Sequence, residues 1–360
     1  MRRGMRQLAR MAQRSPGRAG PLARVADRMP SGQGPRWLRA VLFIAAVMYP
    51  LVFGTGGITQ LLEQIFTFGA LAMSYDLLLG YTGILSFGHA MFFGTGAYAV
   101  AIGLNQGDGR LEGLLVGLAA GIAGSLVLSG IVAFLSLRVR EAYFAMITLA
   151  VGQVLGVLAG SQALRAVTNA GDGLTVPVPD LLSGNLTLYD MCLALLALTA
   201  WALGRLVHSP VGDVLAAIRE NAARAKSLGH PVVRFQTFVF AVSGVIATLA
   251  GAAFALAQSF VNTTVYDVAG VSLNVLLMVV IGGAGTLYGG LLGAALLLTA
   301  QTWFASVAGG APWLREYMLA FGILYIVVVR FMPKGILGAF LHRRGHGRWR
   351  KSSDCKTSQI

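Results

Sequence analysis

The chain has 360 residues, of which 56% are hydrophobic and 12% charged, and its mean hydropathy is +0.70. Soluble domains carry about 25% charged residues, so this composition excludes an ordinary soluble enzyme, and its apolar content excludes a disordered chain. The net charge is +14, yet residues 1–39 and 330–360 together hold 18 Lys or Arg and 2 Asp, which leaves −2 for residues 40–329. Positive charge at both ends of a neutral middle is typical of membrane topology and not of nucleic-acid binding.

Residues 1–36 are basic and precede the first apolar run, and no small-residue cleavage site follows that run. We expect a cytoplasmic tail here rather than a signal peptide, with contact to anionic lipid as a lesser alternative. A second basic cytoplasmic tail is expected over 336–360, and residues 37–335 between them are expected to form a polytopic transmembrane domain. Cys192 lies in an apolar run and Cys355 in the basic tail, which predicts neither a disulfide nor a metal site.

The middle of the chain contains long charge-free runs, and a spanning helix needs about 20 apolar residues. We expect ten spans, at 38–56, 60–80, 86–105, 113–137, 142–164, 188–207, 235–257, 269–283, 288–309 and 317–332. With the N-terminal tail inside, the links predicted to be inside are rich in Arg and Lys, and those predicted to be outside are acidic or mixed. Eight spans would result if 86–105 and 269–283 are re-entrant half-helices.

Glycine makes up 47 of the 360 residues, about 13% against a usual value near 7%. Small residues at helical spacing, such as Gly289 and Gly293, let helix backbones approach closely in a membrane. We therefore expect close packing to explain most glycines, and broken helices only where glycines cluster with polar residues.

Residues 80–94 form such a cluster and read GYTGILSFGHAMFFG. Non-helical backbone at membrane depth is tolerated only against protein or a water-filled cavity. The segment predicts a discontinuous element that lines a translocation path through Ser86, Gly88, His89, Phe92 and Phe93. The alternative is a turn between two spans in which His89 makes one structural hydrogen bond.

The link 208–234 is too polar to span. Asp213 is expected to cap a short helix over Val214 to Leu228, and Gly229 and Pro231 are expected to end it. One face of this helix carries four apolar residues at spacings of three and four: Leu215, Ile218, Ala222 and Ala225.

A pair of opposite charges, Glu220 and Arg224, stands four residues apart on another face of this predicted helix. The small apolar face predicts docking into a groove on a partner protein. A helix lying on anionic lipid is the alternative, but it would need larger apolar anchors.

Residues 280–290 read VIGGAGTLYGG, which resembles a phosphate loop only superficially, because no Gly-Lys pair exists in the chain. We expect a hinge or a close helix contact at Gly282 and Gly283, which we add to the translocation path. No cofactor is expected.

The predicted spans contain few ionisable residues: Glu63, Asp76, His89 and Asp190. Proton-coupled carriers need a chain of buried carboxylates or histidines, and four scattered groups form a poor relay. Energy for transport is therefore expected to come from outside this subunit.

Five sequence blocks together resemble the LivM-type permeases of branched-chain amino acid ABC importers. They are GYTGILSFGHA at 80–90, YFAMITLA at 143–150, NAGDGL at 169–174, AIREN through SLG at 217–229, and GGAGT at 282–286. The blocks occur in family order between about residues 42 and 335. Glu141-Ala142 stands where a Gly is common, and Gly290 where a Pro is common, which weakens any inference about the substrate.

The resemblance implies an all-α integral membrane protein with about ten transmembrane helices in two inverted five-span halves, the type II fold of vitamin B12 importers. It implies a permease domain over 37–335 in a bacterial inner membrane with both termini cytoplasmic. The implied partners are a second related permease subunit, two cytoplasmic ATP-binding cassette subunits and an external solute-binding protein. The residues assigned to ATPase coupling are Ile218, Arg219, Glu220, Arg224 and Gly229.

Other functions stay open at this point. Similar permeases handle urea, short amides and aromatic acids. A stand-alone secondary carrier would work without ATP. An intramembrane serine protease could use Ser243-Gly244 with His89, although a serine bonding back to a carbonyl in its own span is the simpler interpretation.

Overall fold

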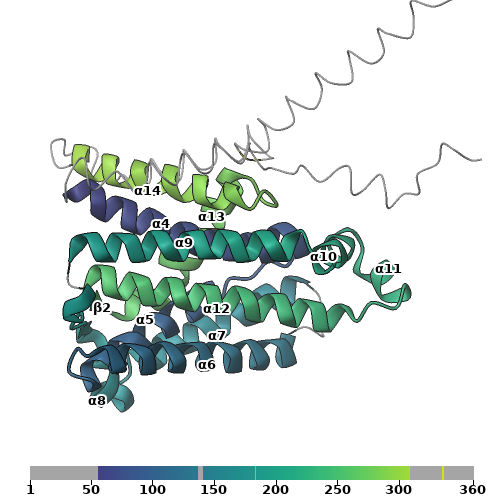
Figure 1. The fold of residues 1–360 in the computed structure, drawn as a ribbon. Helices are drawn as coiled ribbons and strands as arrows, with labels where there is room; N and C mark the ends of the chain where they lie inside the picture. Colours follow the sequence, from purple (N-terminus) through teal and green to yellow (C-terminus); the bar gives the residue numbers. More distant parts are fainter. Residues whose placement is uncertain (1–55, 137–140, 183, 309–334, 336–360) are drawn as a thin grey trace, which may run out of the picture. The chain divides into compact units, whose positions relative to one another are not determined.

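The computed structural model describes residues 56–136, 141–182, 184–308 and 335, which are predominantly helical (Figure 1). The long helices are α4 (Gly57–Asp76), α5 (His89–Gln106), α6 (Leu111–Ser136), α7 (Glu141–Ala159), α9 (Asn185–Val207), α12 (Val232–Gln258) and α14 (Tyr288–Ala308). Two π-helices adjoin α-helices: η1 (Leu77–Thr82) continues α4, and η6 (Val268–Leu273) leads into α13 (Asn274–Gly282).

The connections hold the short elements: η2 (Gln162–Leu164), α8 (Arg165–Thr168), η3 (Ala170–Asp172), η4 (Asp180–Leu182), α10 (Pro210–Glu220), α11 (Ala222–Ser227) and η5 (Thr263–Tyr266). Two short antiparallel strands, β1 (Leu174–Thr175) and β2 (Phe260–Val261), join two of these connections, with Leu174 opposite Val261.

Helices occur at eight of the ten predicted spans, and 38–56 and 317–332 lie outside the described residues. Within the described ranges, four helices are long and apolar enough to cross a membrane: Gly57–Thr82, Leu111–Leu135, Leu186–Val207 and Val232–Gln258. A fifth is added if Tyr143–Ala159 and Gln162–Thr168, which meet at a 58° bend, form one span. The helical membrane architecture agrees with the prediction, and the count of ten stays a prediction.

Two predicted spans differ in detail from the helices found. Residues 83–88 are not helical, so the third span begins only at His89. The span predicted over 142–164 ends as a straight helix at Ala159, because Ser161 adopts an extended conformation before η2 begins. The re-entrant alternative for 269–283 stays open, since η6 and α13 together form only a short apolar helix, Val268–Gly282.

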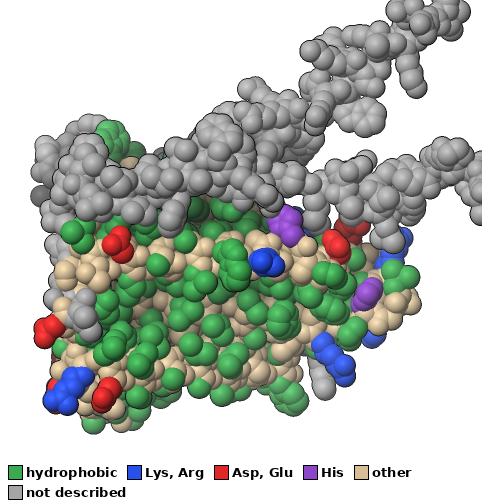
Figure 2. Space-filling model, viewed as in Figure 1, with side chains coloured by type: hydrophobic (Ala, Val, Ile, Leu, Met, Phe, Trp, Pro, Cys, Tyr) green, Lys and Arg blue, Asp and Glu red, His purple; other side chains and the backbone are tan. Residues whose placement is uncertain are grey.

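The connections gather at two ends of the helices. Figure 1 shows α8 and β2 at one end and α10 and α11 at the other, which is the alternation that the predicted span order requires. Between the ends, Figure 2 shows a broad face of hydrophobic side chains. The exposed large hydrophobic residues of the described helices include Phe134, Val157 and Trp201. Apolar side chains on this scale suit lipid or another membrane subunit.

The packed centre is built around α4, α5 and α12, and it depends on glycine. A Cβ atom at Gly251 would lie 1.9 Å from the carbonyl oxygen of Phe93, and one at Gly293 would lie 1.7 Å from that of Met278. No side chain fits at such distances, so these glycines let α12 approach α5 and α14 approach α13. The close packing expected at Gly293 is therefore confirmed.

Replacing Gly293 by Ala should lower the thermal unfolding midpoint of the purified chain, because overpacking costs about 1–3 kcal/mol. The matched control is Gly130→Ala on α6, where a Cβ would meet nothing within 4 Å and better helix propensity adds up to about 1 kcal/mol. Equal midpoints for the two variants would contradict the close contact.

Candidate functional site

The carboxylate of Asp76 joins two distant parts of the chain. Asp76 is the last residue of α4 and is completely buried. Its Oδ1 accepts a hydrogen bond from the backbone N–H of Gly285 at 2.6 Å, and its Oδ2 accepts one from Leu287 at 3.0 Å. Both donors belong to the loop 283–287 between α13 and α14, so one side chain fixes this loop to the end of α4.

The loop 283–287 is built to present these donors. Gly283 and Gly285 have φ angles of 116° and 83°, and Leu287 has one of 39°, all in the left-handed region that favours glycine. This backbone turns the two N–H groups toward Asp76 just before α14 begins. An anion there is also favoured by the dipole of α14.

The glycine motif at 80–94 also contacts Asp76 and the loop 283–287. Gly80 lies in η1, and a Cβ there would stand 2.1 Å from Asp76 Oδ1 and 2.3 Å from the nitrogen of Gly285. The carbonyl oxygen of Gly80 accepts a hydrogen bond from the guanidinium of Arg219 on α10. The structure thus brings together three separately predicted segments, namely the motif at 80–94, the glycine-rich block at 282–286 and the coupling segment.

The helix predicted over Val214 to Leu228 is wrong in both bounds and continuity. α10 begins at Pro210 and ends at Glu220. Asn221 is extended and its Oδ1 accepts a 2.9 Å hydrogen bond from Arg224 N–H, which caps the separate helix α11. Such a side-chain cap competes with continuation of a helix. Gly229 follows α11 with a φ angle of 90°, as predicted for the residue that ends the segment.

The break at Asn221 changes what the segment presents. Leu215, Ile218 and Ala225 are buried within this chain, whereas Ala222 is exposed, so the predicted four-residue apolar face is not available for docking. α10 packs against η1, α9 and α12. The exposed side chains include those of Glu220 and Arg224, which now belong to different helices. The ion pair seen in the described part of the chain joins Arg165 and Asp172, far from this segment.

The predicted path residues lie in the packed interior. Ser86, His89, Phe92 and Phe93 have no exposed surface, and Gly88, Gly282 and Gly283 are also buried. The structure therefore places Gly282 directly before the loop 283–287 and Gly283 within it, and it places the other five at or just before the beginning of α5. Their role in a translocation path stays a prediction.

α5 starts inside the helical bundle, and two backbone N–H groups at and just before its first turn donate to hydroxyl groups of other helices. The N–H of Phe87 donates to Thr148 Oγ1 of α7 at 3.1 Å, and that of Ala90 donates to Ser272 Oγ of η6 at 2.8 Å. A helix start has donors with no partner in the helix itself, and in apolar surroundings each must be satisfied. Neutral hydroxyl groups do this here.

His89 makes a buried link between α5, α12 and α4. Its Nε2 lies 2.9 Å from Ser243 Oγ, and Ser243 Oγ donates to the carbonyl oxygen of Ser74 at 2.7 Å. Because the only hydroxyl proton of Ser243 points to Ser74, His89 must donate through Nε2–H, which leaves Nδ1 as a bare acceptor. Among the described residues Nδ1 has no hydrogen-bond partner.

This geometry contradicts the serine protease alternative. A nucleophilic serine gives its proton to the histidine, which a carboxylate orients through the other ring nitrogen. Here the donation between His89 and Ser243 runs the opposite way, both residues are fully buried, and within the described ranges no acid contacts His89 Nδ1. From the sequence, Ser243 is predicted to bond to a carbonyl of its own helix. This prediction is wrong, because Ser243 donates to the carbonyl of Ser74 in α4.

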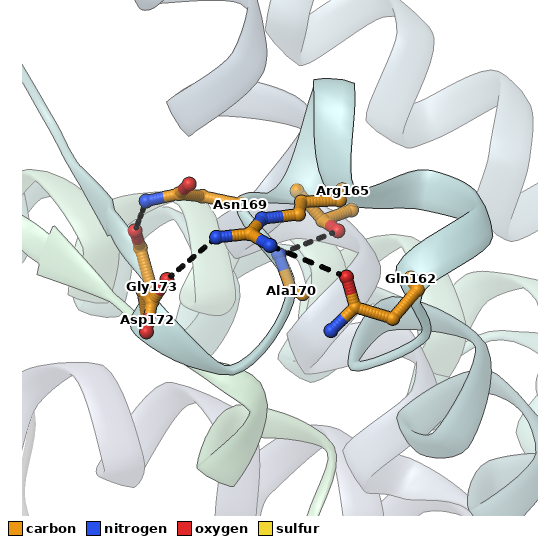
Figure 3. Close-up of polar contacts among 7 residues, drawn as sticks. Gln162, Arg165, Asn169, Ala170, Asp172 and Gly173 are labelled. Carbon is orange, nitrogen blue, oxygen red and sulfur yellow. Dashed lines mark hydrogen bonds and ion pairs between the residues drawn. The ribbon is translucent and has the colours of Figure 1, made fainter.

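The block at 169–174 forms a tight turn at the end opposite α10 (Figure 3). Asn169 has a left-handed backbone and donates through Nδ2 to the carbonyl of Gly173 at 2.9 Å. Arg165 and Asp172 form an ion pair of 3.8 Å, with 60% and 72% of their side chains exposed. Exposed pairs of this kind contribute little, so the turn is held chiefly by its backbone geometry.

Asp76 was absent from the predicted site residues, although it was recognised as one of the few ionisable groups in the spans. The available signal was its position four residues before Gly80, which places both on one side of a helix. Its partners, more than 200 residues further along the chain, carry no local pattern that points back to it.

Comparison with known proteins places the chain in a family. Residues 57–328 match the family described as branched-chain amino acid transport system / permease component. The chain belongs to this family. That match covers the described helices from α4 to α14, including the loop 283–287 and α10. It confirms the resemblance based on the five sequence blocks.

Individual relatives are similar over most of the chain. The high-affinity branched-chain amino acid transport system permease proteins LivM of Salmonella typhimurium and of Escherichia coli are each 27% identical, over 82% of this chain and 73% of the relative. The permease protein BraD of Pseudomonas aeruginosa is 25% identical over 76% of this chain and 92% of its own. The autoinducer 2 import permease LsrC of Yersinia pseudotuberculosis is 29% identical over 56% and 58%.

Replacing Ser243 by Ala should lower the thermal unfolding midpoint of the purified chain. The change leaves a buried carbonyl and the Nε2–H of His89 without their partner, at a cost of about 1–3 kcal/mol each. Ser227→Ala is the control, since Ser227 is exposed and bonds only to carbonyls of its own helix. An unchanged midpoint for Ser243→Ala would mean that the link between α4, α5 and α12 contributes nothing to stability.

Proposed function

We propose that this chain is a membrane-spanning subunit of an ATP-binding cassette importer for branched-chain amino acids. The observation that carries the proposal is the family match over 57–328. The names of the LivM and BraD relatives supply the substrate class and the transport role. For the complete chain we propose about ten helices in two inverted five-span halves, the arrangement implied by the family resemblance.

The proposed complex contains a second related permease subunit, two ATP-binding cassette subunits and an external solute-binding protein. It lies in a bacterial inner membrane, with residues 1–36, 336–360 and the coupling segment 208–234 on the cytoplasmic side. The described charges support this orientation, because Arg224, Lys226 and Arg234 lie at the α10 end and Asp172 and Asp267 lie in connections to the opposite end.

The coupling residues have different tasks in this proposal. Ile218 is buried and anchors α10, and Gly229 allows the turn after α11. Glu220 and Arg224 are exposed and would contact the ATPase subunits. Arg219 is also exposed, and its guanidinium donates a hydrogen bond to the carbonyl of Gly80. Closure of the ATPase dimer would displace α10, and this chain would change conformation in response without hydrolysing ATP itself.

The proposed path retains Ser86, Gly88, His89, Phe92 and Phe93, together with Gly282 and Gly283. Since all are buried in this structure, they would meet the substrate in another conformation of the transport cycle. The runner-up substrates are urea, short amides and aromatic acids. The LsrC relative is named for import of autoinducer 2, so sequence similarity to this chain occurs among permeases for other solutes as well.

Reconstitution of the purified complex tests the function. Vesicles containing the full complex, ATP inside and the binding protein outside should accumulate labelled leucine, isoleucine or valine, and unlabelled urea, acetamide or phenylalanine should compete poorly. Strong competition by one of these would instead favour a runner-up substrate. Accumulation against a gradient by this chain alone, without ATPase subunits, would identify a secondary carrier.

Reversing the charge of Glu220 should reduce ATP-driven uptake by about tenfold or more while the chain still inserts. Opposing like charges across an interface costs several kcal/mol, and Glu220 is exposed at the end of α10. Glu112→Lys, also exposed but in the first turn of α6 at the other end, is the control and should transport normally. Normal uptake by Glu220→Lys would argue against contact between this residue and the ATPases.

A further inference from the structure

The Asp76 carboxylate is buried without a direct ion pair in the described part of the chain. Its charge is stabilised by two backbone N–H donors of the loop 283–287. A carboxylate in an apolar interior costs several kcal/mol unless such donors satisfy it, so its position is tied to theirs. Asp76 cannot move away from the loop without losing the interactions that permit its burial.

Arg219 lies on the other side of the backbone of Gly80 and Gly285 from Asp76. It donates to the carbonyl of Gly80, and a Cβ at Gly285 would lie 3.1 Å from its Nη1. Gly80 and Gly285 therefore separate the guanidinium from the carboxylate by a thin layer of backbone. The positive and negative groups hold this layer from its two sides, and only glycine leaves room for them.

Both segments that form the layer interrupt helices. η1 is a π-helix that ends α4, and 283–287 is the turn from α13 into α14. π-Helical turns are rare and occur frequently at functional sites. Here η1 is held from α10 through Arg219, and the loop is held from α4 through Asp76.

Further along, the two helices leaving this point pack tightly. A Cβ at Gly290 of α14 would lie 3.0 Å from the backbone of Ala72 in α4. Once the ends of α4 and α14 are joined at Asp76, their close backbone contact makes independent sliding of the two helices costly.

We propose that Asp76 is a positioning residue that makes α10, η1 and the 283–287 loop move as one body, so that displacement of α10 reaches α4 and α14 together. This rests on the proposed function, because it takes α10 as the element that the ATPases displace. Arg219 passes the displacement to Gly80, and Asp76 passes it on to the beginning of α14.

The first test compares transport with ATP hydrolysis in the complete reconstituted complex. Asp76→Leu removes both acceptors and should cut uptake at least tenfold while hydrolysis stays within about twofold. Asp76→Asn keeps one acceptor oxygen and should lose less, about threefold. Asp190→Leu, an exposed acid on α9, is the matched control and should behave like the wild type.

A double variant tests whether Asp76 and Arg219 act in one chain of contacts. Arg219→Gln should also uncouple hydrolysis from uptake, and Asp76→Leu/Arg219→Gln should be no worse than the stronger single change. Multiplied losses would overturn the proposal, because they would mean two independent effects. Loss of uptake and hydrolysis in parallel with the amount of assembled complex would also overturn it, since Asp76 would then be needed only for folding.

A second readout does not depend on the transported solute. Ala284 is exposed in the loop, and Ala284→Cys, in a chain with Cys192 and Cys355 replaced by Ser, can be labelled with a maleimide. Trapping ATP in the complex should change the labelling rate severalfold, and Asp76→Leu should abolish that change. An unchanged rate in the Asp76-containing chain would overturn the proposal even if amino acid uptake is normal. If uptake fails for every branched-chain amino acid but the rate responds as expected, only the proposed substrate is wrong.

Discussion

The hydrogen bonds from Gly285 and Leu287 to Asp76 set the constraint on which the rest of the architecture depends. A polypeptide in an apolar environment can leave the helical conformation only where its freed N–H groups find partners. The loop 283–287 adopts left-handed backbone angles that preclude regular internal pairing, and a carboxylate from another helix supplies the acceptors. A single side chain therefore ties the beginning of α14 to the end of α4, and the close backbone contact of Gly290 with Ala72 holds the two helices together further along.

The same requirement is met differently at the beginning of α5. There the freed N–H groups of Phe87 and Ala90 bond to the hydroxyls of Thr148 and Ser272, which carry no charge. Each of these hydroxyls comes from a different segment, so the break in the chain becomes a junction of several helices. A neutral acceptor is enough where one donor must be satisfied, and a carboxylate serves where two donors converge beside the guanidinium of Arg219. This explains how a bundle with so few ionisable residues can contain several interruptions.

The general architecture follows from the sequence because the properties that encode it are local. Charge-free runs predict where helices lie, and the glycines among polar residues at 80–94 predict the non-helical stretch before His89. Gly229 and Gly293 were interpreted correctly for the same reason, since a turn and a close helix contact are each read from a few neighbouring residues.

The interactions that escaped prediction are of two kinds. The pairing of Asp76 with Gly285 links residues 209 positions apart, and nothing in either segment specifies the other. The break after Glu220 arises from a competition that periodicity does not register, in which the Asn221 side chain caps the next turn in place of continued helix. The regular spacing of apolar residues across 215–225 gives no sign of that break, and it predicts a docking face of which the chain buries Leu215, Ile218 and Ala225.

The corrected geometry gives α10 two directions of contact. Successive residues on a helix point about 100° apart, so Arg219 can reach the backbone of Gly80 while its neighbour Glu220 faces outward. Ending the helix immediately after Glu220 keeps that side chain at the exposed tip, and the buried Leu215 and Ile218 fix the helix against the bundle. A continuous helix through residue 228 would place Arg224 one turn beyond Glu220 on the same face, and the two charges would satisfy each other. The break separates them onto two short helices, which leaves both charges free to face a partner while Arg219 holds the inner contact.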